Sequence, residues 1–217
     1  MTSPITQFKK RDESQIMIIP TRSQCLVLME EALMPEHIQK HSVVVAQIAV
    51  YLGRLLNQNS VRLNLELLEA GALLHDIAKA RSLATGERHE DLGARMLEDW
   101  GYTLISPIVK EHVILNDAVL KGPITESLVV NYADKRVKHD QVVSLRERFS
   151  DLINRYAKSD EHRVWLQEKF DLYLQLEAMM FEHLAINPDD LDQAIGRAVT
   201  GHTAARRQMG ELWLVRN

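Results

Sequence analysis

Apolar residues recur at spacings of three and four along most of this chain, and no stretch alternates apolar and polar residues for more than a few positions. The first pattern is typical of amphipathic helices, and the second would be typical of half-buried strands. With 9 glycines and 6 prolines in 217 residues, the chain also has few places for hairpin turns. The sequence therefore predicts an all-α fold.

Capping residues indicate where the helices begin. Thr21, Asn64 and Thr125 each precede an apolar run and are candidate N-caps. A short extended piece is expected at 16–19, and the polar stretch that leads to Gly86 is assigned no helix. The expected helices run over 21–33, 35–57, from 64 to an end between 75 and 78, 89–99, 107–112, from 125 onward, 145–156 and 160–184, with a shorter one from 187–188.

Composition excludes several functional classes. Lys and Arg number 26 against 30 Asp and Glu, so the net charge is −4 and the basic excess of a nucleic-acid-binding protein is missing. The mean hydropathy is −0.19, and no apolar run approaches the ~20 residues that span a bilayer. The polar start also lacks the apolar core of a signal peptide. We therefore expect a cytoplasmic protein that contacts no membrane.

Cysteine usage narrows the possible metal sites. Cys25 is the single cysteine, which rules out an intrachain disulfide and every multi-cysteine metal framework. We expect a reducing compartment. Any metal ion would have to be held by histidines and carboxylates.

The dipeptide His75-Asp76 follows the apolar run 70–74 directly, so a helix delivers two polar side chains at its buried end. Burying an unpaired carboxylate costs several kcal/mol, about 3–5 when a buried pair is broken, and a metal ion would compensate for that cost. His41 lies on the apolar face of the helix expected over 35–57. His89, His112 and Asp134 lie in comparable apolar settings.

Taken singly, each of these residues has a simpler interpretation, because an inward histidine or aspartate is often satisfied by a backbone carbonyl or a helix cap. Taken together, they form a set of nitrogen and oxygen ligands without thiolate. Such a set suits Fe, Mn, Ni, Co, Zn or Mg, with positions left open for water and substrate.

The order of these residues resembles a known family. His41, then His75-Asp76, then Asp134 is similar to the H…HD…D signature of the HD-domain metal-dependent phosphohydrolases. The string from Gly71 to Lys79 is close to that family's LLHDIGK form, and 132–135 is close to its closing ADK form. The resemblance covers about 35–156 and implies an all-helical HD-domain bundle.

The resemblance also implies roles for individual residues. His41, His75 and Asp134 would hold a first divalent metal ion. His89 and His112 match the extra histidines of the binuclear branch and would hold a second ion, with Asp76 bridging the two; a single ion is the alternative. Lys79 would contact a substrate phosphate, and Asp76 with Lys79 would be the catalytic pair. Ala78 departs from the family, which often has Gly there.

The activity implied by the resemblance is hydrolysis of a small phosphate ester, a nucleotide or a dinucleotide, by metal-activated hydroxide attack on phosphorus. Two other classes stay open. The chain could be a regulatory module that binds metal and nucleotide without turnover, or a di-iron oxygenase on the same fold. Phosphate release, iron retention and oxygen-dependent substrate loss would discriminate them.

The boundaries that we expect are an N-terminal extension at 1–20, partly disordered, an HD domain at 21–158 and a C-terminal helical segment at 159–217. Large apolar residues in that segment, Trp165, Phe170, Tyr173, Met179, Met180 and Phe181, predict packing on the domain or a homodimer contact.

Several other polar residues compete with the six metal candidates. His139-Asp140 is a second HD dipeptide, but polar neighbours indicate a solvated surface. His37 is interpreted as a helix-entry residue, and Arg146 and Arg148 as surface ion-pairing residues with phosphate binding as the alternative. His162, His183 and His202 are assigned no role.

Overall fold

The computed structural model describes residues 18–182 and 184–197. Within these ranges the chain is mostly α-helical with one two-stranded ladder, so the all-α prediction is confirmed. No helix in the described ranges is long and apolar enough to cross a membrane. Of the extended piece expected at 16–19, residues 18–19 form no strand and the rest lies outside the described ranges. His183, His202 and most of the expected N-terminal extension also lie outside them.

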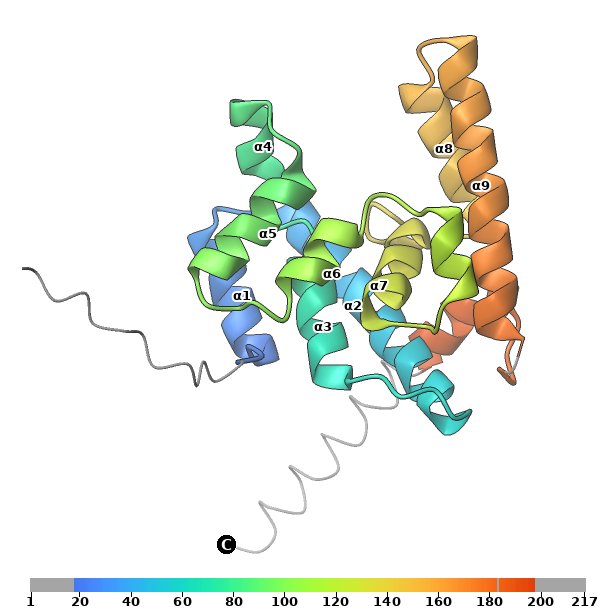
Figure 1. Ribbon diagram of the computed structural model, residues 1–217, viewed down its shortest axis with the longest axis horizontal. Helices are drawn as coiled ribbons and strands as arrows, with labels where there is room; N and C mark the ends of the chain where they lie inside the picture. Colours follow the sequence, from blue (N-terminus) through green and yellow to red (C-terminus); the bar gives the residue numbers. More distant parts are fainter. Residues whose placement is uncertain (1–17, 183, 198–217) are drawn as a thin grey trace, which may run out of the picture.

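Figure 1 shows how the helices pack together, coloured in chain order. Residues 191–197 are helical as well. In chain order the elements are α1 (Arg22–Glu31), α2 (Glu36–Gln58), α3 (Leu65–Leu74), α4 (Lys79–Thr85), α5 (His89–Asp99), α6 (Ser106–Glu111), η1 (Asp117–Lys121), α7 (Glu126–Lys135), β1 (Val137–Lys138), β2 (Gln141–Val142), α8 (Leu145–Tyr156), α9 (Asp160–Phe181) and η2 (Pro188–Asp190).

Side-chain caps fix the starts of the helices. The Thr21 hydroxyl accepts a hydrogen bond from the Gln24 backbone N–H in a capping box at α1, and Asn64 and Thr125 cap α3 and α7 in the same way. A cap satisfies N–H groups that the first helical turn leaves without a partner. The helix starts expected at these residues are therefore confirmed.

Two elements differ from the sequence prediction. The helix that starts after Asn64 ends at Leu74 with His75 as its C-cap, at the early limit of the expected range, and after a turn the polar stretch forms the unexpected helix α4. A short antiparallel hairpin pairs Val137 with Val142 and Lys138 with Gln141. Each of its strands has two residues, which is too short for an alternating pattern to be visible.

Two glycines bring α6 close to its neighbours. A Cβ atom at Gly71 in α3 would lie 2.7 Å from Ile108 Cγ2, and one at Gly93 in α5 would lie 3.0 Å from Val109 Cγ1. Both contacts are shorter than the usual separation of packed carbon atoms, about 3.5–4.0 Å. The glycines therefore let α6 approach α3 and α5, and His112 at the end of α6 comes near His75.

The helices α8 and α9 lie side by side at one end of the molecule, opposite α1 and α5 (Figure 1). Buried Tyr173 and Leu176 of α9 belong to the same apolar core as α2 and α3. Buried Arg136, just after α7, donates hydrogen bonds to Glu177 and to the Pro188 and Val143 carbonyls. The segment after α8 is thus joined to the rest of the described chain through a core and a satisfied buried cation.

Candidate metal centre

Six side chains from five parts of the chain meet at one place. His41 comes from α2, His75 and Asp76 from the turn after α3, His89 from the first residue of α5, and His112 and Asp134 from the end of α6 and from α7. Ligand atoms of five of them form two overlapping groups, each within 4.8 Å: His41, His75 and Asp134, and His75, Asp76 and His112. The sixth, His89, lies beside the second group, with Nε2 3.2 Å from Asp76 Oδ1.

The first group is arranged around one carboxylate oxygen. Asp134 Oδ1 lies 2.9 Å from His41 Nε2 and 3.7 Å from His75 Nε2. Asp134 and His75 are buried, so bulk water has little access to these atoms.

The second group is arranged around Asp76. Its Oδ1 lies 3.2 Å from His89 Nε2 and 3.5 Å from His112 Nε2, and the two imidazole nitrogens are 3.1 Å apart. Its Oδ2 lies 3.6 Å from His75 Nε2. The two oxygens of Asp76 therefore face different histidines, and Asp76 stands between the two groups.

Each imidazole is held through its other nitrogen. His41, His75 and His112 contact the carbonyl oxygens of residues 139, 72 and 109 through Nδ1, at 2.9, 2.7 and 2.5 Å. A carbonyl oxygen only accepts, so each Nδ1 donates and each neutral ring keeps a bare lone pair on Nε2. His89 Nδ1 lies 3.2 Å from a Glu90 carboxylate oxygen, with the same consequence. Metal-binding histidines in proteins are oriented in this way.

One atom tests directly whether an ion fits. His75 Nε2 is buried and has no hydrogen-bond partner among the residues that the structure describes. Buried polar atoms are nearly always satisfied. A divalent ion between His75 and the two carboxylates would satisfy this nitrogen, so the residues present fit a metal ion.

Electrostatics keep the carboxylates ionised. Burial alone would raise the pKa of Asp76, but the charge of His75 and the hydrogen bonds of His112 and His89 hold it well below its usual range. Burial would likewise raise the pKa of Asp134, and Lys135 with His41 and His75 holds it well below that range. Both groups are therefore anionic at neutral pH, the form that binds cations.

The histidines are affected in opposite directions. Burial would lower the pKa of His75, but Asp76 and Asp134 raise it above its usual value. Burial lowers the pKa of His112, and His75 adds to this effect against the opposing influence of Asp76. A proton on His75 thus partly compensates the two carboxylates, and a divalent ion would take its place.

Two lysines lie beside the cluster. Lys79 Nζ is 3.2 Å from Asp76 Oδ1 and 3.5 Å from His89 Nε2. Helix α3 ends before Lys79, and the turn after α3 brings this lysine to the cluster. Lys135 Nζ lies 2.5 Å from Asp134 Oδ2 and donates to the His112 carbonyl at 3.4 Å. No separate role was predicted for Lys135 from the sequence, although it directly follows Asp134.

A cavity of about 380 Å³ opens beside the cluster. Asp76, Lys79 and Asp134 line it, together with residues 113–115. Other lining residues come from α8 and α9 and were not predicted from the sequence; they include Arg148, Phe149, Leu152, Tyr156, His162, Trp165, Leu166, Lys169 and Tyr173.

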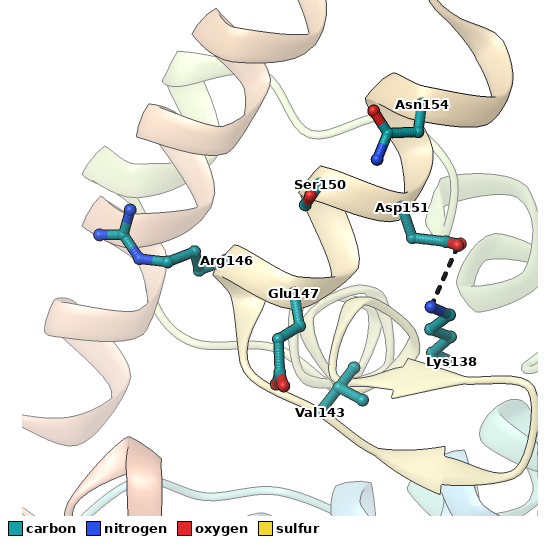
Figure 2. A pocket seen from close by; sticks show the side chains of 7 residues that line it. All are labelled: Lys138, Val143, Arg146, Glu147, Ser150, Asp151 and Asn154. Carbon is teal, nitrogen blue, oxygen red and sulfur yellow. Dashed lines mark ion pairs between the residues drawn. The ribbon is translucent and has the colours of Figure 1, made fainter.

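Among the residues that the structure describes, the other histidines and arginines considered from the sequence lie outside the two candidate metal-binding groups. The side chains of His37 and His139 are exposed. Arg148 lines the cavity and lies 3.6 Å from Asp151, whereas Arg146 lies beside a different pocket and points away from Asp151 (Figure 2).

The hairpin that contains His139 is tied to α8. Lys138 in β1 forms a 3.2 Å ion pair with Asp151 (Figure 2). Arg155 forms a 3.0 Å ion pair with the same Asp151 oxygen and contacts His139 Nε2 at 3.2 Å. Although its ring is exposed, His139 therefore lies in a braced turn whose carbonyl orients His41.

Comparison with known proteins assigns the cluster to a family. The family model described as HD domain matches residues 38–138, a range that contains all six candidate ligands and Lys79. The chain thus carries an HD domain over residues 38–138. The HD superfamily is one of metal-dependent hydrolases, and the buried histidines and aspartates of this chain are its candidate metal-binding residues.

Two curated relatives match this HD-domain protein. Ribonuclease Y of Fervidobacterium nodosum is 28% identical over 179 residues, which are 82% of this chain and 32% of the relative. The uncharacterized protein MJ0778 of Methanocaldococcus jannaschii is 28% identical over 135 residues, 54% of this chain and 79% of that protein. The chain thus spans about a third of the length of the first relative. No solved structure gives a significant match.

Proposed function

We propose that this HD-domain protein is a metal-dependent phosphohydrolase that acts on a small phosphate ester, a nucleotide or dinucleotide. The observation that carries the proposal is the set of histidines whose Nδ1 atoms are engaged and whose Nε2 atoms converge on Asp76 and Asp134. An open cavity lined by three lysines adjoins this set, so a phosphorylated ligand can reach it.

His41, His75 and Asp134 would hold one divalent ion, and His89 and His112 a second, with Asp76 between them. The separate orientation of the two Asp76 oxygens supports two ions rather than one. Such ions supply Lewis-acid activation of water and neutralise charge on a phosphoryl group.

The chain's own residues have distinct tasks in this proposal. The ionised carboxylates of Asp76 and Asp134 keep the centre anionic before the ion enters. Lys79, whose side chain is 42% exposed at the cavity, donates hydrogen bonds to a non-bridging phosphate oxygen. Lys135 is held on Asp134 and balances its charge.

RNA is a second candidate substrate, favoured by the similarity to ribonuclease Y over most of this chain. The net charge of −4 argues against a long nucleic acid, because phosphate-backbone binding depends on clustered cations. A short oligoribonucleotide therefore belongs in the substrate panel.

The test combines metal analysis with a substrate screen. Purified protein is loaded with Mn, Fe, Ni, Co or Mg, bound metal is counted, and phosphate release is measured over nucleotides, dinucleotides and a short oligoribonucleotide. We expect phosphate release from at least one nucleotide, abolished by chelation. Metal and nucleotide binding without any product would support the regulatory module instead, and oxygen-dependent loss of substrate with retained iron would support the oxygenase.

A further inference from the structure

The wall of the cavity that faces the metal centre comes from outside the residues matched to the HD domain. Trp165 in α9 and Tyr156 at the end of α8 line it, with 45% and 52% of their surface exposed. Phe149, Leu166 and Tyr173 line the same cavity and are buried. The exposed rings thus belong to an aromatic wall that includes residues of the core.

The Trp165 ring is held in place by its neighbours on α9. Lys169 Nζ lies 5.8 Å from the ring centroid and donates a 2.9 Å hydrogen bond to the Leu115 carbonyl. The ring of His162, three residues before Trp165, lies 5.6 Å from the Trp165 ring between centroids. Since Leu115 follows His112 by three residues, Lys169 fixes the indole relative to the loop that leaves the metal centre.

Direct contacts connect this wall to the metal ligands. Lys135, which contacts Asp134, lies 5.8 Å above the Tyr173 ring, and Tyr173 packs against Phe149 at 5.3 Å between centroids. One cavity is therefore lined both by residues of the metal cluster and by the exposed aromatic rings.

The charges of the cavity indicate what kind of ligand fills it. Lys79, Lys135, Arg148 and Lys169 line it, and its carboxylates, Asp76 and Asp134, are occupied by histidines and lysines. An anion is therefore favoured. Inorganic phosphate would leave the aromatic rings uncovered, and an aliphatic ester would not use the ring faces for stacking. The volume, about 380 Å³, is that of a small-ligand site.

We propose that Trp165, assisted by Tyr156, stacks on the nucleobase of a nucleoside monophosphate whose phosphate lies at the metal centre. The position of the phosphate rests on the proposed function above, whereas stacking of the base is a binding property that needs no turnover. Stacking tolerates any base, because every base has a π-face. The α8–α9 hairpin would then make the site prefer nucleotides over other phosphate esters.

The test separates base binding from hydrolysis. Adenosine, which has no phosphate to release, is titrated into metal-loaded protein carrying Trp100→Phe and Trp213→Phe, so that Trp165 remains as the one tryptophan of the sequence. We expect quenching of its fluorescence on binding. By calorimetry, Trp165→Leu in the wild-type background should weaken adenosine binding about ten- to a hundredfold, and Trp165→Phe should retain most of the affinity. The matched control is Trp100→Leu, because the Trp100 ring is exposed at the end of α5 and does not line this cavity.

The second measurement is the ratio of kcat/KM for AMP to that for ribose 5-phosphate, which should fall about ten- to a hundredfold in Trp165→Leu. Absence of quenching, unchanged adenosine affinity in a folded Trp165→Leu, or equal use of both esters by the wild type would overturn the proposal. Hydrolysis without adenosine binding would refute the stacking site alone. Adenosine binding that depends on Trp165, without any phosphate release, would support the site and refute the proposed hydrolase.

Discussion

The imidazole of His41 is oriented by the backbone of His139, whose carbonyl oxygen accepts a 2.9 Å hydrogen bond from His41 Nδ1 across 98 residues of sequence. His139 has a φ of 56°, a left-handed conformation that is uncommon for a residue with a side chain. The hairpin turn therefore orients a metal-centre histidine through the backbone carbonyl of His139 and not through the His139 ring.

Substitutions at His139 separate these two contributions. His139→Gly keeps the left-handed turn, and we expect metal content and turnover to stay within about twofold of the wild type. His139→Ala should behave similarly in activity and be less stable than His139→Gly, because a residue with a Cβ is strained at this φ. His139→Pro fixes φ near −65° and should weaken metal binding about ten- to a hundredfold, as loss of an outer partner typically does. Equal metal affinity in the Gly and Pro variants would show that the carbonyl contact is unimportant.

Asp76 faces both histidine groups, so its removal should affect the whole centre. We expect Asp76→Ala and the isosteric Asp76→Asn to lose bound metal and phosphate release together. Metal analysis and a phosphate assay measure this, and Asp91→Ala, on the surface of α5, is the control. Full activity of either Asp76 variant would exclude the proposed mechanism.

His89 and His112 report on the number of ions. His89→Ala, the milder change because His89 is partly exposed, should lower bound metal from about two equivalents to about one while the fold persists. His112→Ala should do the same with some loss of stability. The exposed His37 provides the control variant, His37→Ala. A wild type that never exceeds one equivalent under anaerobic Fe or Mn loading would contradict the binuclear arrangement.

Lys79 lies at the cavity and beside Asp76, so it can act on the substrate rather than on the metal. Lys79→Ala should keep the metal complement and lose roughly a hundredfold in kcat/KM, about 2.7 kcal/mol of transition-state stabilisation. Lys79→Arg should restore part of this loss, because a planar guanidinium does not replace a compact ammonium. Lys110→Ala on α6 is the control, and unchanged kinetics in Lys79→Ala would remove the assigned role.

Cys25 gives a prediction that does not depend on the metal centre. Burial raises the pKa of the Cys25 thiol to about 12, from 9.0. Because the folded state disfavours the thiolate, its contribution to stability is complete below pH 9 and is lost as the pH rises toward 12. Urea unfolding should therefore show an additional loss approaching about 1.4 kcal/mol per pH unit above pH 9 in the wild type relative to Cys25→Ser. Parallel pH profiles of the two proteins would contradict this burial.

Local sequence patterns predicted much of the fold. The Thr21, Asn64 and Thr125 caps mark helix starts because a cap bonds to N–H groups two or three residues away, within reach of a sequence motif. The helix α4 and the hairpin at 137–142 were missed, because α4 buries no residue and so shows no apolar stripe, and each strand of the hairpin has two residues. The candidate ligands were found because each is a polar residue within an apolar run.

By itself, the sequence determined that the chain is helical and that His75 and Asp76 leave a buried helix together, because periodicity and caps act over a few residues. The tertiary structure alone decided that Trp165 and Lys169 face the same cavity as Asp76, and that a carbonyl at residue 139 orients His41. These residues lie about 90 to 100 positions apart, so no local pattern links them, and the packing of separate helices brings them together.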